Sequence, residues 1–106
     1  MSVEREVRLL PAARDDLKQL YDYIADDSGT RVADRYIDRI EMACAGLSMF
    51  SSRGTRRDDL GLGFRSIGFE RRATIVFSVG DDEVTIIRIF YGGQDFEAAF
   101  GDEPES

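Results

Sequence analysis

The sequence predicts one α+β domain in which an N-terminal short strand and a helical hairpin precede a three-stranded antiparallel sheet. Two patterns support this prediction. Between residues 11 and 50, hydrophobic side chains recur at intervals of three and four, which is the period of an amphipathic helix. Between residues 64 and 91 they alternate, which is the period of a strand. A length of 106 residues, with 42% hydrophobic and 33% charged side chains, suits a single folded domain.

The N-terminal half is expected to contain one strand and two helices. Residues 5–10 place Val7 and Leu9 on one face, as in a short strand, and Pro11 suits the first turn of a helix. The helices should span residues 11–27 and 31–50, with Thr30 capping the second. Their inner stripes are Ala13, Leu17, Leu20 and Ile24 in the first helix, and Ala33, Tyr36, Ile37, Ile40, Cys44 and Leu47 in the second.

A second hydrophobic stripe lies on the opposite side of the second predicted helix, near its end. It consists of Met42, Ala45, Gly46 and Met49. A helix that is hydrophobic nearly all round is normally covered on both sides. Either the domain's own sheet supplies the second cover, which is the favoured expectation, or a partner protein does, because exposed apolar patches often mark interfaces.

The C-terminal half should form strands at residues 64–69, 73–79 and 84–91, after a polar, glycine-rich loop at 51–62. The last strand is hydrophobic on both faces, with Val84, Ile86 and Phe90 on one and Ile87, Ile89 and Tyr91 on the other. Such a strand is normally central and covered on both sides. The helices cover one face, and a bound partner segment would cover the other. Residues 95–100 are expected to form one helical turn, and the acidic tail, 101–106, to be disordered.

Charge and composition narrow the function. The net charge of −7 lies within residues 81–106, which carry one basic and eight acidic side chains, whereas segment 51–72 is basic. A net-acidic domain is a poor general nucleic-acid binder, because that binding rests on neutralising phosphates. The chain has one cysteine and no apolar run of membrane-spanning or signal-peptide length. The predicted location is therefore the cytoplasm.

The residues required for most catalytic sites are missing. The chain has no histidine, which excludes Ser-His-Asp and Cys-His arrangements and removes the commonest metal ligand. Cys44 lies within an inner stripe and is expected to be a buried hydrophobic residue. We therefore predict no catalytic, cofactor or metal site. Arg65 and Arg88 lie within strands, so each either pairs with an internal acid or faces a groove that receives a partner.

Short motifs in a fixed order give the chain a family resemblance over roughly residues 7–96. They are Pro11-Ala12-Ala13 with Asp16-Leu17, then Arg35-Tyr36-Ile37-Asp38, Gly63-Phe64-Arg65-Ser66 and Val84-Thr85-Ile86-Ile87-Arg88-Ile89. In this order and spacing they resemble the ParE branch of the RelE/ParE superfamily, the toxin halves of bacterial toxin–antitoxin pairs. The resemblance implies one toxin domain over residues 1–100. It also implies a ParD-like, ribbon-helix-helix antitoxin whose C-terminal segment wraps the toxin in a hetero-oligomer, and inhibition of DNA gyrase by protein contact.

The resemblance and the hydrophobic patterns together predict an antitoxin-binding surface and no direct contact with nucleic acid or membrane. The predicted antitoxin-binding residues are Met42, Met49, Arg65, Ile87, Arg88, Ile89 and Tyr91.

Two alternatives remain open. One is a RelE-type, ribosome-dependent mRNA endoribonuclease that would use Arg65, Arg72, Arg88 and Tyr91. The other is a non-toxic interaction module. The nuclease alternative is disfavoured because Thr74, Tyr91 and Gly93 occupy the positions where its relatives keep an arginine, a histidine and a further basic residue.

Overall fold

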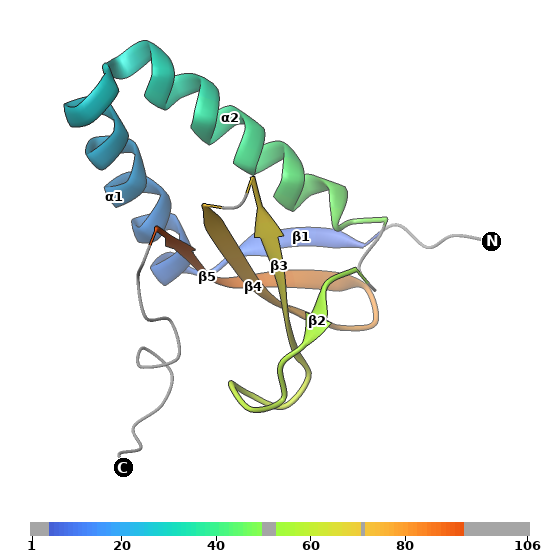
Figure 1. Ribbon diagram of the computed structural model, residues 1–106. Helices are drawn as coiled ribbons and strands as arrows, with labels where there is room; N and C mark the ends of the chain where they lie inside the picture. The colour runs from blue at the N-terminus through green and yellow to red at the C-terminus, as the bar shows by residue number, and fades with distance from the viewer. Residues whose placement is uncertain (1–4, 50–52, 71, 93–106) are drawn as a thin grey trace, which may run out of the picture.

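The computed structural model of the chain describes residues 5–49, 53–70 and 72–92. It confirms the α+β class and the helical hairpin, and the sheet is a mixed one of five strands (Figure 1). The elements are β1 (Glu6–Leu9), α1 (Pro11–Ser28), α2 (Thr30–Gly46), β2 (Thr55–Arg56), β3 (Phe64–Phe69), β4 (Ala73–Val79) and β5 (Glu83–Tyr91). The helical turn expected at 95–100 and the tail at 101–106 lie outside the described residues.

The sheet has the strand order β1-β5-β4-β3-β2. The predicted strands β3, β4 and β5 form consecutive antiparallel pairs, whereas β1 lies parallel to β5 at its other edge. Strand β2 lies within the segment expected to be a loop, where Thr55 pairs with Ser66 and Arg56 with Arg65. Two polar residues carry no detectable hydrophobic alternation, so the sequence pattern gave no sign of this strand.

The helices differ from prediction mainly at their ends. Pro11 is the first residue of α1, as expected, but Gly29 rather than Thr30 caps α2, with a φ of 96° that glycine adopts readily. Helix α2 ends at Gly46, four residues earlier than predicted. The Leu47 and Ser48 N–H groups donate to carbonyls only three residues back, which tightens the chain into a turn. This turn directs Leu47, 1% exposed, into the core.

One face of the sheet carries the two helices, which form a V whose apex projects beyond the strands (Figure 1). The core between these layers contains the predicted inner stripes, although Ile37 is only partly buried. From the sheet, the fully buried Ile75, Phe77, Val84 and Ile86 complete it. Each such side chain contributes about 1.5–3 kcal/mol of burial free energy, so this interface holds the domain together.

A bulge in β5 corrects the predicted division of its faces. Val76 pairs with Arg88 and Phe77 with Ile86, so Ile87 has no opposite residue on β4. An extra residue reverses the alternation beyond it. Ile89 therefore packs in the helix-side core, on the same face as Val84 and Ile86, and the prediction that placed it on the opposite face is wrong.

Candidate functional site

Three tyrosines from different elements meet where the helical hairpin approaches the end of the sheet. Tyr23 comes from α1, Tyr36 from α2 and Tyr91 from the last position of β5. The ring of Tyr91 stands edge-on to those of Tyr23 and Tyr36, with centroids 5.7 Å apart in both pairs. Tyr36 makes a similar contact with Phe69, at 5.5 Å. We call Tyr23, Tyr36 and Tyr91 the tyrosine cluster; it is bordered by two pockets.

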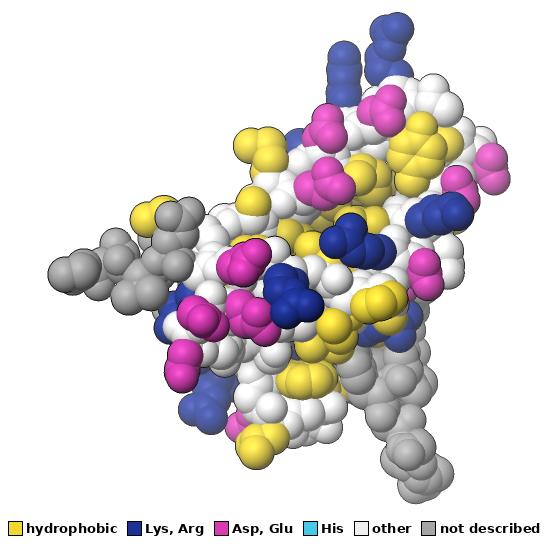
Figure 2. Space-filling model, turned by 180° about the vertical axis from the view of Figure 1, so that it is seen from behind, with side chains coloured by type: hydrophobic (Ala, Val, Ile, Leu, Met, Phe, Trp, Pro, Cys, Tyr) yellow, Lys and Arg dark blue, Asp and Glu magenta, His cyan; other side chains and the backbone are white. Residues whose placement is uncertain are grey.

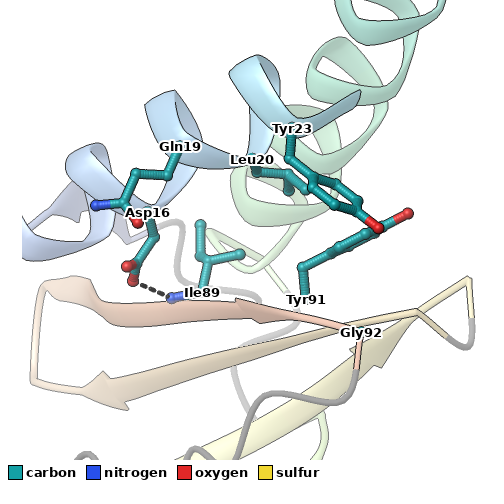
Figure 3. Close-up of a pocket in the computed structure, with 7 residues that line it drawn as sticks. All are labelled: Asp16, Gln19, Leu20, Tyr23, Ile89, Tyr91 and Gly92. Carbon is teal, nitrogen blue, oxygen red and sulfur yellow. Dashed lines mark hydrogen bonds between the residues drawn. The ribbon is translucent and has the colours of Figure 1, made fainter. Parts of the chain in front are cut away.

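The first pocket, of about 400 Å³, lies between α1 and β5 and is called the α1–β5 pocket. Asp16, Gln19, Leu20 and Tyr23 descend from the helix, while Ile89, Tyr91 and Gly92 form the opposite wall (Figure 3). The rings of Tyr23 and Tyr91 lie together at one end of it (Figure 3). A cleft with an apolar floor and a few polar groups is suited to receiving a ligand or a partner side chain.

Asp16 lies at the other end of the α1–β5 pocket (Figure 3). Strand β1 pairs with β5 only as far as Ile86, so beyond that point no strand among the described residues lies beside β5 on that side. The Asp16 carboxylate accepts a hydrogen bond from the Ile89 N–H at 2.9 Å (Figure 3). It also accepts two from the Arg88 guanidinium, at 2.7 and 2.9 Å. Asp16 thus satisfies part of an exposed sheet edge.

The pairing with Asp16 settles which of two expectations holds for Arg88. The side chain pairs with an internal acid, and its hydrogen bonds to that carboxylate raise the pKa of Arg88. The guanidinium also lies 5.0 Å from the centroid of the Phe90 ring. The Asp16 side chain is 10% exposed and that of Arg88 31%, so the pair is partly shielded from water, which strengthens the attraction between the two charges.

The second pocket, of about 290 Å³, lies between the two helices and the β3–β4 turn and is called the hairpin pocket. Arg39 of α2 lines it and donates hydrogen bonds of 2.7 and 3.0 Å to Glu70 in that turn. These bonds lower the pKa of Glu70. This pair joins residues that are 31 positions apart in the sequence. Arg72 donates to the Tyr91 hydroxyl at 3.4 Å.

Tyr36 is the buried polar residue of the hairpin pocket. Its side chain is 7% exposed, and its hydroxyl has no hydrogen-bond partner among the described residues. Burial, together with the neighbouring Tyr91 and Glu70, raises the pKa of Tyr36 to about 12. An unpaired buried hydroxyl is costly and uncommon in folded proteins, which makes it a candidate contact for a ligand.

The outer stripe of α2 is exposed to solvent. Met42 is 74% exposed and Met49, in the turn after the helix, is 50% exposed. The favoured expectation that the domain's own sheet covers this stripe is therefore wrong, because the sheet packs only against the opposite side of the helix. Cys44, on that opposite side, is buried as predicted, and burial raises the pKa of its thiol to about 12.

The structure separates the predicted antitoxin-binding residues into three places. Arg88, Ile89 and Tyr91 gather along the edge of β5, beside the bulged Ile87. Arg65 lies two strands away on β3, opposite Phe77 of β4. Met42 and Met49 lie on the outer side of the helical layer.

Sequence reasoning missed four residues that shape the two pockets, namely Asp16, Tyr23, Tyr36 and Glu70. The one available signal was Tyr36, a residue with a polar end inside an otherwise apolar stripe.

The charged surface of the described residues is mixed in sign. Figure 2 shows hydrophobic side chains emerging among both acidic and basic ones on the face seen from behind. Within residues 5–49, 53–70 and 72–92, no three His, Cys, Asp or Glu side chains are grouped so that they could hold a metal ion. In the same ranges, neither helix is long and apolar enough to cross a membrane.

Both the sequence and the fold are similar to those of proteins from known toxin–antitoxin systems. Toxin ParE3 of Caulobacter vibrioides is 28% identical over 97 residues, covering 92% of this chain and 95% of that protein. A solved structure described as the chromosomal ParDE toxin–antitoxin system of P. aeruginosa superposes with a TM-score of 0.73 at 23% identity, covering 84% of this chain and 97% of the matched one. The RelBE2 toxin–antitoxin complex of Mycobacterium tuberculosis gives 0.58 at 23% identity, with coverages of 87% and 95%.

The two structural matches establish the fold, and the family model establishes membership. Residues 7–96 match the model described as the ParE toxin of the type II toxin–antitoxin system parDE. That match spans most of the chain, including both helices, β3, β4, β5 and the residues of both pockets. The chain therefore belongs to the ParE toxin family of type II toxin–antitoxin systems.

Proposed function

We propose that this toxin is neutralised by a ParD-like, ribbon-helix-helix antitoxin and that, when free, it inhibits DNA gyrase by protein contact in the cytoplasm. The observation that carries the proposal is the match to the ParE family over residues 7–96. Action by contact is also consistent with the chemistry of the described residues. The Cys44 thiol is buried with a raised pKa, and the chain has no histidine to serve as a general base.

The antitoxin surface that we propose joins the outer stripe of α2 to the edge of β5. Met42 and Met49 supply exposed, adaptable hydrophobic contacts, which are enriched at protein interfaces. Along β5, Ile87, Arg88, Ile89 and Tyr91 border the α1–β5 pocket or lie beside it. Arg65 extends the proposed surface to β3, where a basic side chain would speed the approach of an acidic partner.

Hydrogen exchange tests this surface. Amide exchange should be compared between the free toxin and its complex with the small protein encoded in the adjoining reading frame. New protection is expected in residues 42–49 and 84–91. A complex that forms without new protection in either segment would remove these residues from the interface, while leaving the pairing itself intact.

A supercoiling assay tests the target. Purified gyrase should lose supercoiling activity as toxin is added, and prior addition of the antitoxin should restore it. Heat-denatured toxin at the same concentration is the control for non-specific inhibition. Full supercoiling by purified gyrase at excess folded toxin, when expression of the same toxin still arrests the growth of cells, would refute gyrase as the target.

A RelE-type endoribonuclease is the second candidate, and one contact favours it. Arg72 and Tyr91 are two of the four residues it would use, and the Arg72 guanidinium lies 3.4 Å from the Tyr91 hydroxyl in the lining of the hairpin pocket. Against it, Arg88 is held by Asp16, and Arg65 lies on a strand that β4 separates from β5. Transcript mapping in growth-arrested cells decides between the candidates, because intact messages exclude the nuclease.

A further inference from the structure

The hairpin pocket contains hydrogen-bond donors that the described residues do not satisfy. The Tyr36 hydroxyl has no hydrogen-bond partner among the described residues, although Tyr36 is only 7% exposed. Beside it, the Arg72 guanidinium makes one side-chain hydrogen bond, the long contact to Tyr91. A guanidinium carries five N–H donors and no acceptor, so most of its capacity is available to a ligand.

The acids of the hairpin pocket are already engaged. Glu70 accepts two hydrogen bonds from Arg39, and Asp27 accepts one from Ser28. Neither carboxylate accepts a hydrogen bond from the Tyr36 hydroxyl or from Arg72 in the structure. The missing group is an acceptor that can accept a hydrogen bond from a hydroxyl and two parallel hydrogen bonds from a guanidinium at the same time. A carboxylate meets both requirements.

The geometry points to the hairpin pocket as the receptor for one carboxylate of the antitoxin, an Asp or Glu side chain or a C-terminal carboxylate, bound by Tyr36 and Arg72. This inference rests on the proposed pairing with an antitoxin and specifies one contact within it. The carboxylate accepts a hydrogen bond from the Tyr36 hydroxyl and a bidentate pair from Arg72. Arg72 is exposed and its contact with Tyr91 is long, at 3.4 Å, so its guanidinium is able to turn toward the ligand.

A protein carboxylate fits the pocket better than an RNA phosphate does. The lining carries two arginines, Arg39 and Arg72, and two acids, Asp27 and Glu70, so it offers no excess of positive charge to a polyanion. Its walls include Val32, 47% exposed, and Tyr23, 62% exposed, which suit the aliphatic stem of an acidic side chain. Burial and its neighbours keep Tyr36 protonated far above neutral pH, so it remains a donor.

Two variants with matched controls test the inference. Tyr36→Phe removes only the hydroxyl, and Arg72→Gln replaces the charged guanidinium by a shorter, neutral amide. Tyr21→Phe and Arg35→Gln make the same changes outside the pocket. Affinity for the protein from the adjoining frame is measured by calorimetry. Because a hydrogen bond to a charged group contributes about 1.5–3 kcal/mol, each pocket variant should weaken binding by roughly tenfold or more. The controls should remain within about threefold.

Variants of the antitoxin identify the carboxylate. Each Asp and Glu of its bound segment is changed to Asn or Gln, and its C-terminal carboxylate is amidated. One of these changes should weaken binding to the wild-type toxin and have little further effect on Arg72→Gln. The denaturation midpoint of free Tyr36→Phe should equal or exceed that of the wild type, because the hydroxyl has no partner to lose.

The possible outcomes distinguish the proposed pairing with an antitoxin from the proposed carboxylate contact. A wild-type chain that binds no product of the adjoining frame overturns the proposed pairing and this inference with it. A wild-type complex whose affinity is unchanged in Tyr36→Phe and Arg72→Gln overturns the inference alone. If these variants instead lose binding to a short labelled RNA and keep the antitoxin, the occupant is a phosphate and the carboxylate assignment is wrong.

Discussion

Removing the carboxylate of Asp16 should destabilise the toxin far more than removing an exposed acid. The Asp16 side chain is 10% exposed and Arg88 is 31% exposed, and Asp16 also holds the Ile89 N–H at the edge of β5. Breaking a fully buried ion pair costs about 3–5 kcal/mol. Because Arg88 retains partial access to water, we expect about 2–3 kcal/mol for Asp16→Ala. Asp16→Asn should cost about 1–2 kcal/mol, since its amide oxygen can still accept from Ile89.

Urea denaturation of the purified toxin measures this effect, with Glu83→Ala as the matched control. Glu83 pairs with Arg8 at 3.4 Å on the surface, where the two side chains are 39% and 65% exposed, so its loss should cost less than about 1 kcal/mol. A double-mutant cycle of Asp16→Ala with Arg88→Ala should give a coupling of about 1–3 kcal/mol. If Asp16→Ala is no more destabilising than Glu83→Ala, or if the coupling is near zero, the Asp16–Arg88 pair does not stabilise the fold as proposed.

Three further predictions concern the core, the surface pair and the outer stripe. Cys44 should be unreactive toward a thiol reagent at pH 8 in the folded chain and react at once in denaturant, because burial raises its pKa to about 12; rapid native labelling would contradict this. The pKa of Glu70 lies below its ordinary 4.5, so its pair with Arg39 stabilises the fold above that pH and weakens as pH falls through the lower folded value. The midpoint difference between wild type and Glu70→Gln should therefore shrink between pH 6 and pH 3. Met42→Lys should leave the midpoint unchanged, because Met42 is 74% exposed, and weaken antitoxin binding severalfold by calorimetry; unchanged affinity would exclude Met42 from the interface.

The sequence predicted those parts of the fold in which burial repeats along the chain. The stripes of α1 and α2 follow the helical period, and nearly all of their members are buried. Strand β4 alternates, and its Ile75 and Phe77 are in the core. In each case a side chain's burial is decided by its place in a local repeat, which a sequence displays directly.

The features that escaped prediction depend on contacts between distant segments. The bulge at Ile87 is a property of the pairing of β5 with β4, and it reversed the predicted faces of the strand from that point on. The partner of Arg88, Asp16, is 72 positions away, and no sequence pattern distinguished it from the other acidic residues of its helix as an ion-pair partner. The unpaired hydroxyl of Tyr36 is likewise visible only once three elements have been brought together.

The parallel pairing of β1 with β5 has a consequence for the order of events during synthesis. Arg8 and Glu83, which pair across these strands, are 75 positions apart. Strand β1 must wait for the synthesis of β5 before it finds its neighbour, and non-local pairing of this kind slows folding. While the ribosome adds residues at about 5–20 per second, the sheet stays incomplete. The emerging polypeptide therefore completes this sheet only after β5 has left the ribosome, and until then β1 lacks the strand beside which it lies in the folded domain.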